Sequence, residues 1–563
     1  MAANSPRCSL PVYLLVFFWR LCGRLPCAPA LSATPVPSPS PPCPLPASAQ
    51  QYLGYAILIC FGYLRDAFGR LFRLQKYRTR PGYAPLLRDF EDFYTRRLYH
   101  RIQDCWGRPI ASPAGAWISI VARRFLKTPA GLSLEVAVPA HVPPPTCSAD
   151  DAAALAAAPT TRVLNMGSYN YLGYAEVPGG VDGAVFDALT TYGVSTCAPA
   201  ATGGHTDVHE RLEAAVAAFV GKPAAIVLGM GFATNAQLLP ALVGAGCLIL
   251  SDALNHASII MGARSSGAAV RVFAHNDAAS LEAVLRAAIV DGQPGGGGPW
   301  RKILIVVEGM YSMEGETCDL RAMVAIKKRY GAYLFLDEAH SIGALGATGR
   351  GVCEHYGVPP ADVDVMMGTF TKSFGAVGGY VAATAAVVDH VRAAAPGVLY
   401  STTMAPPCAA HILWALAQIA GTDGTEVGAT KLAALRANSI YFRARLTTMG
   451  VKIYGDYDSP VVPIMLFHPA KIAAFSRECL ARGVAVVVVG FPATPLLLSR
   501  ARICVSAAHS RGDLDLALGV IEEVATLLQI RFHRPTVWGR VRGGAALLGR
   551  ALYPPSPRAV GAH

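Results

Sequence analysis

The chain has 563 residues, of which 53% are hydrophobic and 15% charged, with a formal net charge of +12 at pH 7. This composition excludes disorder throughout the chain and allows at least one large core. The 14 cysteines form no C-x-x-C pair and no Cys/His group at zinc-ligand spacing, so we expect no metal site. Much of the positive charge lies at 65–80 and 531–550, beside apolar stretches, which favours a membrane surface over nucleic acid.

The first 80 residues are predicted to form a leader and linker (1–50) and a membrane-associated segment (51–80). The leader holds a short apolar run, Leu10 to Trp19, and a proline- and serine-rich tract that cannot form a packed core. A second apolar run, Tyr52 to Tyr63, ends in basic residues. Both runs are shorter than the roughly 20 residues that span a bilayer, so an interfacial or re-entrant anchor, a transmembrane helix and a cleaved signal peptide stay open.

After a lead-in arm at 81–162, residues 163–405 are predicted to form a large α/β domain. Strand-like apolar runs alternate there with alanine-rich helical segments, which indicates a mostly parallel sheet covered on both faces. A smaller C-terminal domain at 406–530 and a basic tail at 531–563 follow. The five runs are AAIVLGM, CLILSD, KILIVVEG, AYLFLDEAH and VDVMMGTFTK.

Ligands of such sheets bind beyond the carboxyl ends of the strands, so the residues after each run are candidates for chemistry. Gly231 and Phe232 follow the first run and open GFATN, which could begin a helix that binds a phosphate through its free N–H groups. A glycine turn before a helix is, however, more often a packing feature. His256 follows the second run, where a solvated surface histidine is the ordinary alternative.

The later runs give a sharper pattern. Asp337 could hold a protonated pyridine nitrogen, and His340 could donate to the phenolic oxygen of the same ring. Lys372, placed among hydroxyl residues, suits a Schiff base with an aldehyde cofactor. The letters DEAH also mark helicases, but the chain has no G-x-x-x-x-G-K-[ST] phosphate loop. Four strand ends thus each supply a different part of one pyridoxal 5′-phosphate (PLP) site.

Six segments resemble the α-oxoamine synthase family of PLP enzymes: GTFTKSFGAVGGY, LDEAHSIGALGATGRG, LILSDALNHAS, VEGMYSMEG, NMGSYNYLGY and VVVVGFPATP. The stretch DFEDFYTRRLYHRIQDCWGRPIASPAGAW and the GFPATP loop are similar in particular to the lysine-bearing subunits of eukaryotic serine palmitoyltransferases. The resemblance covers roughly residues 52 to 532. It implies a fold-type I aminotransferase architecture and a dimer with active sites at the subunit interface.

The resemblance also implies a role for each candidate residue. Lys372 corresponds to the Schiff-base lysine, His256 to the histidine that stacks on the ring, Asp337 to the partner of the ring nitrogen and His340 to the partner of the ring oxygen. The remaining matches are phosphate contacts at Gly231, Phe232, Thr369 and Thr371, and a contact to the amino-acid carboxylate at Arg502, with Asn170 as a second candidate. Asn170 could equally cap a turn, and an arginine in an apolar run often has a buried anionic partner.

The implied activity is that of a serine C-palmitoyltransferase, a decarboxylating condensation of L-serine with a long-chain acyl-CoA that yields 3-ketosphinganine. The implied partner is a homologous subunit without the lysine, or a second copy of the chain. We expect the protein to lie at the endoplasmic reticulum membrane, with its catalytic domain facing the cytosol. A sister synthase with another amino acid and acyl-CoA, and a non-catalytic scaffold, are the alternatives.

One position departs from the family. Nine residues before His209, where the family usually has an arginine, this chain has Ala200. The handling of acyl-CoA is therefore the step most open to change.

Overall fold

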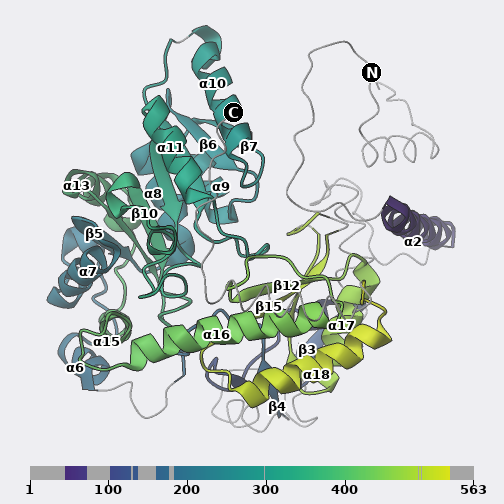
Figure 1. Cartoon of the computed structure of the whole chain (residues 1–563). Helices are drawn as coiled ribbons and strands as arrows, with labels where there is room; N and C mark the ends of the chain where they lie inside the picture. The colour runs from purple at the N-terminus through teal and green to yellow at the C-terminus, as the bar shows by residue number, and fades with distance from the viewer. Residues whose placement is uncertain are drawn as a thin grey trace. The chain divides into compact units, whose positions relative to one another are not determined.

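Figure 1 shows the computed structural model of the chain. The structure describes residues 45–72, 102–128, 131–136, 160–176, 183–296, 298–491, 493–495 and 498–532. The chain divides into two compact units, Met1–Ile57 and Leu58–His563. The apolar run from Leu10 to Trp19 and the basic tail beyond residue 532 lie outside the described residues.

Helix α2 (Leu45–Leu71) contains the second predicted apolar run. Within the second unit this helix exposes large apolar side chains, namely Phe61, Leu64, Phe68 and Leu71. In the described part of the chain, no helix combines the length and the hydropathy of a bilayer-crossing segment. Membrane association of the segment 51–80 stays a prediction.

A seven-stranded sheet with the strand order β5-β11-β10-β9-β8-β6-β7 forms the centre of the second unit. Its pairings are parallel, except that β11 runs antiparallel to both of its neighbours. The predicted mostly parallel sheet is therefore confirmed, and the sequence had not singled out β11. The strands are β5 (Ala224–Leu228), β6 (Leu248–Asp252), β7 (Ala269–Phe273), β8 (Ile303–Glu308), β9 (Tyr333–Asp337), β10 (Val365–Thr369) and β11 (Gly379–Ala383).

Helices cover both faces of this sheet (Figure 1). Side chains alternate along β8 between two cores, since Ile305 and Val307 pack in one and Leu304 and Val306 in the other. Burial on both faces explains why the strands read as continuous apolar runs. The first core includes α7 (Asp207–Val220), α10 (Ala278–Asp291), α11 (Leu320–Tyr330) and α15 (Pro406–Ala420), and the second includes α8 (Gly231–Leu242), α9 (Ala257–Ser265) and α13 (Ala385–Ala394).

The C-terminal part of the chain, joined by β1 and β4 from before the large sheet, packs around a third core and two small sheets. Strand β4, at the predicted boundary of 163, pairs in parallel with β13 of the C-terminal part. Helix α15, which follows the predicted boundary of 406, packs in the core of the large sheet. Contacts therefore cross both predicted domain boundaries, and the boundaries stay predictions. The elements are β1 (Trp117–Val121), β4 (Thr160–Asn165) and β13 (Val484–Ala485) in one sheet, β12 (Val461–Met465), β14 (Val487–Val489) and β15 (Arg500–Cys504) in the other, and α16 (Val427–Thr448), α17 (Pro469–Ala481) and α18 (Arg511–Leu527).

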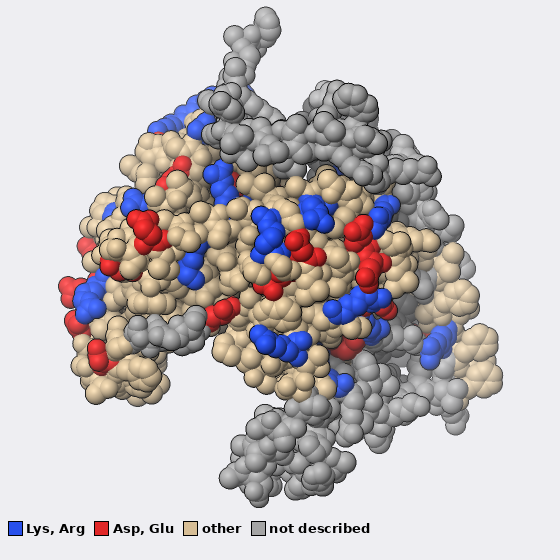
Figure 2. All heavy atoms as spheres, turned by 60° about the horizontal axis from the view of Figure 1, so that its bottom comes forward, with Lys and Arg blue, Asp and Glu red and all other residues tan. Residues whose placement is uncertain are grey.

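Acidic and basic side chains are interspersed on the face shown in Figure 2. In the C-terminal part, Arg482 pairs with Glu478 at 2.6 Å and with Glu523 at 3.2 Å, which connects α17 with α18. Exposed pairs of this kind contribute about 0–1 kcal/mol each.

Candidate active site

The carboxyl ends of β8, β9 and β10 meet at one edge of the large sheet because these strands are parallel neighbours. In the strand register, Glu308 lies beside Asp337, and Asp337 lies beside Met367. The charges of Asp337 and Lys372 both act on His256, and those of Lys372 and His256 act on His340. The structure therefore brings these predicted residues together.

Lys372 is half-buried in the turn that follows β10. Its Nζ lies 5.4 Å from the centroid of the Tyr169 ring. Burial lowers the pKa of Lys372 to about 8, although the nearby carboxyl groups of Asp337 and Glu308 oppose this shift. A larger share of the amine is therefore neutral near pH 7 than in an ordinary lysine, and the neutral form is the one that acts as a nucleophile or a base.

Asp337 ends β9 and is buried. Its Oδ2 accepts a hydrogen bond from Asn235 Nδ2 at 2.7 Å, and its Oδ1 accepts one from the backbone N–H of Ala339 at 2.9 Å. Both oxygens are thus oriented by neighbouring groups. This leaves a fixed carboxyl group at the edge where a ring nitrogen is expected.

His256 is the N-cap of α9. Its backbone N–H donates to Glu308, and its Nδ1 lies 2.7 Å from Ser258 Oγ. Burial lowers its pKa, partly offset by Asp337, and the charge of Lys372 lowers it further. The lowered pKa favours the neutral ring near pH 7, and the ring packs edge-on against Phe232 at 6.0 Å between centroids.

His340 is buried in the turn after β9, where its Nδ1 lies 2.8 Å from the hydroxyl of Tyr171. Burial lowers the pKa of His340 well below its ordinary value, and the positive charges of Lys372 and Arg502 add to the effect. A neutral ring whose Nδ1 accepts from Tyr171 carries its proton on Nε2. In that tautomer, with Tyr171 as the donor to Nδ1, the Nε2–H can donate to an oxygen such as the one expected on the cofactor ring.

The predicted phosphate contacts gather at the start of α8. This helix begins at Gly231, and the N–H groups of a first helical turn have no partners within the helix. A Cβ at Gly231 would come 2.6 Å from Thr369 Oγ1, so the close approach requires glycine. Thr369 donates its proton to Gly378 O at 2.8 Å, and Thr371 Oγ1 lies 2.9 Å from Thr369 Oγ1. Because the single hydroxyl proton of Thr369 goes to Gly378 O, Thr371 donates its own hydroxyl proton to Thr369 Oγ1, and the donors left for a phosphate are the N–H groups at the start of α8.

Arg502 lies in β15, in the C-terminal part of the unit. Its guanidinium carbon is 4.3 Å from the centroid of the Tyr169 ring, and its Nη1 is 3.6 Å from Met313 Sδ. Its Nε is buried without a hydrogen-bond partner, and none of the described acidic side chains forms an ion pair with it. The buried anionic partner considered as an alternative is absent from the described residues, and the cation remains available for a ligand.

Asn170 uses its amide within the protein. Its Nδ2 donates to Ala114 O at 3.1 Å, and its Oδ1 accepts from the backbone N–H of Ala175 at 3.2 Å. These bonds correspond to the turn-capping alternative. A substrate contact by Asn170 would have to replace one of them.

Several residues at this edge were not predicted. Glu308 follows an apolar run as Asp337 does, so the strand-end rule that selected Asp337 would also have found it. Tyr169 lies between two cations, because its ring contacts both Lys372 and Arg502. No pattern in the sequence indicates that contact, since it joins three distant segments.

Ala200 begins a short 3-10 helix and packs at the margin of the core that α8 and α9 share. Close to it in sequence, His209 is buried, with its Nε2 2.7 Å from Met404 O. Where the family usually has an arginine, this chain thus has a half-buried alanine.

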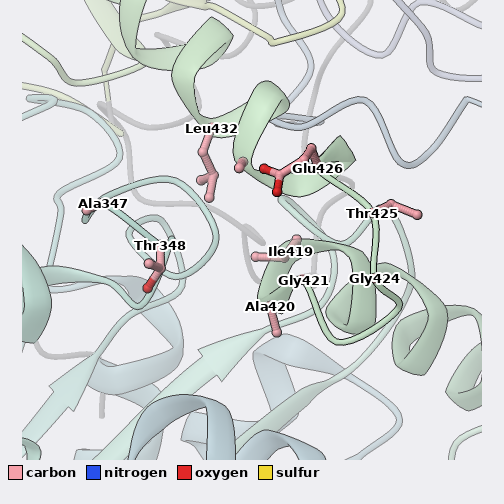
Figure 3. Close-up of a pocket in the computed structure, with 10 residues that line it drawn as sticks. Ala347, Thr348, Ile419, Ala420, Gly421, Gly424, Thr425, Glu426 and Leu432 are labelled. Carbon is pink, nitrogen blue, oxygen red and sulfur yellow. The ribbon is translucent and has the colours of Figure 1, made fainter.

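Two cavities, of about 290 and 550 Å³, lie elsewhere, and none of the predicted site residues lines either of them. Figure 3 shows the smaller one, where Leu432 and Glu426 lie across from Ala347 and Thr348. The larger lies among α6 (Gly183–Tyr192), α7 and α15. The candidate site is therefore identified by the chemistry of its side chains, and not by either of these two cavities.

Comparison with known proteins identifies the family of this chain. The sequence model of the family "Aminotransferase class I and II" matches residues 161–521. The chain is 52% identical over 478 residues to long chain base biosynthesis protein 2d of Oryza sativa subsp. japonica, covering 85% of this chain and 93% of that protein. It is 48% identical over 483 residues to serine palmitoyltransferase 2 of Dictyostelium discoideum, covering 86% and 94%.

A solved structure of serine palmitoyltransferase from S. paucimobilis, titled as a variant with bound PLP–myriocin aldimine, is similar with a TM-score of 0.60 and 29% identity over 66% of this chain and 89% of that one. The predicted fold-type I architecture and the resemblance to this group are thus confirmed. The chain belongs to the aminotransferase class I and II family, and within it to the group of the serine palmitoyltransferase and long chain base biosynthesis protein 2 subunits.

Proposed function

We propose that this chain is the catalytic, lysine-bearing subunit of a serine palmitoyltransferase. It uses PLP to condense L-serine with a long-chain acyl-CoA, with loss of carbon dioxide, to give 3-ketosphinganine. The observation that carries the proposal is the position of Lys372 at one sheet edge with Asp337, His256 and His340. Relatives that share about half of its residues over most of their length are named serine palmitoyltransferase 2 and long chain base biosynthesis protein 2d, which supports the proposal.

The described residues fit PLP. The close approach at Gly231 and the helix start suit a phosphate, Asp337 suits a ring nitrogen, and the Nε2–H of His340 suits a ring oxygen. Lys372 supplies an amine that is partly neutral. When bound, the cofactor supplies an electron sink for the bond cleavages at the amino-acid Cα.

The protein then has three tasks. Arg502 binds the carboxylate of serine, because its Nε is buried without a partner and its charge is unpaired. Lys372 Nζ accepts the proton from serine Cα, which its lowered pKa allows near neutral pH. Asp337 would pair with a protonated ring nitrogen, since its two oxygens are oriented by Asn235 Nδ2 and the backbone N–H of Ala339.

A product assay tests the proposal against the sister-synthase alternative. The purified chain, with its associated subunits, is incubated with palmitoyl-CoA and either serine, glycine or alanine. We expect 3-ketosphinganine from serine and much less product from the other two. A dominant product from glycine or alanine would favour a sister synthase, and no change of the PLP spectrum with serine would favour a scaffold.

The partner subunit belongs to the proposal. Large apolar side chains stay exposed near the site in this single chain, including Met230, Phe232, Val377 and Tyr400. A homologous subunit without the lysine, or a second copy, would cover such side chains. Size measurement of the purified assembly, with mass spectrometry of its subunits, identifies the partner.

Membrane association of the chain also belongs to the proposal. The exposed apolar side chains of α2 support binding to a membrane surface, and the water-insoluble product gives that binding a use. We place the chain at the endoplasmic reticulum with its catalytic part in the cytosol. Replacing Phe61, Leu64 and Phe68 by serine is expected to release the protein from co-sedimenting vesicles of zwitterionic and anionic lipids.

A further inference from the structure

Hydrogen bonds connect Asp337 with His256 through two residues that the sequence did not assign to the site. Asn235, in α8, donates from Nδ2 to Asp337 Oδ2 at 2.7 Å and to Ser258 Oγ at 3.0 Å. Ser258, in α9, has its Oγ 2.7 Å from His256 Nδ1. Asn235 and Ser258 are each 1% exposed, so solvent does not compete for the bonds among Asp337, Asn235 and Ser258, whereas His256 at the end of this chain of bonds is exposed.

The direction of each bond follows from the number of protons. A serine hydroxyl carries one proton, and Ser258 Oγ already accepts from Asn235. Its own proton therefore goes to His256 Nδ1. The backbone N–H of Ser258 also donates to Nδ1, at 3.2 Å. Because Nδ1 accepts two hydrogen bonds, the neutral imidazole keeps its proton on Nε2.

The orientation of Asn235 is consistent with this direction. The opposite orientation would place Oδ1 against the carboxylate of Asp337, which has no proton to donate when ionised. In the observed orientation Asn235 Oδ1 is buried without a partner. A buried unpaired oxygen is unfavourable, and both protons of the same amide are used by Asp337 and Ser258.

His256 is also fixed from its backbone. Its N–H donates to Glu308, which stands next to Asp337 in the register of β8 and β9. The imidazole is thus held at Nδ1 and at the main chain. Neither attachment uses Nε2.

We propose that Asn235 and Ser258 are positioning residues that join Asp337 and His256 into one hydrogen-bonded unit and set the Nε2–H tautomer of His256. The assignment deepens the proposed function and rests on it, because it concerns the two residues expected at the nitrogen and the face of the cofactor ring. Asp337 cannot turn away from that ring without breaking the bond to Asn235. His256 can donate only from Nε2.

The first test reads the tautomer directly in the apoprotein. The chain is labelled with ¹⁵N-histidine, and the ring signals of His256 are assigned by their loss in His256→Gln. We expect an unprotonated Nδ1 and a protonated Nε2 in the natural sequence. Ser258→Ala should add a population with a protonated Nδ1, whereas Ser258→Thr, which keeps a hydroxyl, should not.

Ser265→Ala is the matched control, since Ser265 is an exposed serine of the same helix whose Oγ donates to Met261 O. It should leave the His256 signals unchanged. A protonated Nδ1 in the natural sequence, or unchanged signals in Ser258→Ala, would overturn the proposal. This readout needs no activity, so its failure is distinct from a failure of the proposed function.

The second test measures the dissociation constant of PLP from the apoprotein in a double-mutant cycle. Ser258→Ala is expected to weaken binding by about 3- to 10-fold and Asn235→Ala by about 10- to 100-fold, as for the loss of a neutral and of a charge-assisted hydrogen bond. Within one connected unit the double variant should fall short of the product of the two effects. Independent, multiplying effects contradict the proposal. Circular dichroism checks folding, and if Asn235→Ala does not fold, the Ser258→Ala and Ser258→Thr pair decides.

Discussion

The two sides of the candidate site differ in how completely their polar groups are paired. On the sheet side, Asp337 and His256 are held by Asn235, Ser258 and Ala339. On the β15 side, Arg502 contacts an aromatic ring and a sulfur, and its Nε has no partner. The first side is organised by the protein alone, whereas the second keeps a buried cation for a ligand.

A neighbour in the same strand sharpens the contrast. Arg500 is also buried, but its guanidinium donates to Met313 O at 2.8 Å and pairs with Glu314 at 3.1 Å. Two arginines two residues apart thus differ in whether the protein supplies hydrogen-bond partners for their guanidinium groups. Because buried polar groups are normally paired, the unpaired one indicates the binding position.

The largest effect is expected on the sheet side. Lys372→Ala should reduce the formation of 3-ketosphinganine by about 1000-fold or more, because it removes both the covalent attachment and the base. The characteristic absorbance of the enzyme-bound cofactor should disappear as well. The melting temperature should stay close to that of the natural protein, and retained activity would break the mechanism.

Asp337→Asn tests the charge on the same side while keeping the shape of the side chain. We expect a loss of about 100-fold in kcat, because a neutral amide stabilises a protonated ring nitrogen less well than a carboxylate. The KM for serine should change much less. An unchanged kcat would show that the charge of Asp337 has no part in the reaction.

Arg502→Ala tests the β15 side. Loss of a charge-assisted bond to the carboxylate should raise the KM for serine by about 10- to 100-fold and leave the spectrum of the bound cofactor unchanged. Arg500→Lys serves as the control, since it should lower the melting temperature without raising this KM. Equal effects of the two variants on KM would remove the distinction between the arginines.

The pKa of Lys372 gives a pH dependence that an exposed lysine would not show. Burial lowers this pKa to about 8, so the neutral, nucleophilic fraction in the apoprotein rises with pH and levels off above 8. The rate of PLP incorporation, followed by absorbance, should rise about tenfold per pH unit below the pKa. A continuing rise up to pH 10 would mean an ordinary, solvated amine.

The smallest effect concerns the substrate entrance. Ala200→Arg restores the residue usual in the family, and a partly exposed cation gains at most about 1 kcal/mol from an anionic group. We expect a decrease of up to about fivefold in the KM for palmitoyl-CoA with no change in the KM for serine. An increase in the KM for palmitoyl-CoA would mean that the half-buried position cannot accept the larger side chain.

The sheet side was largely predictable, and the β15 side only through the resemblance. Asp337, His340 and Lys372 each follow a continuous apolar run, and parallel strands bring their carboxyl ends to one edge. Glu308 obeys the same rule and was overlooked. Arg502 follows no such rule, because β15 belongs to another sheet.

The sequence alone determined the alternation of strands and helices and the cofactor class, and it predicted the lysine, the acid and the two histidines as site residues, because these depend on local order along the chain. Only the tertiary structure decided which polar groups are paired. The bonds of Asn235 to Asp337 and Ser258, and the position of Tyr169 between Lys372 and Arg502, join residues from separate elements. Pairing depends on distances of a few ångströms between such elements, and these distances exist only once the sheets have packed.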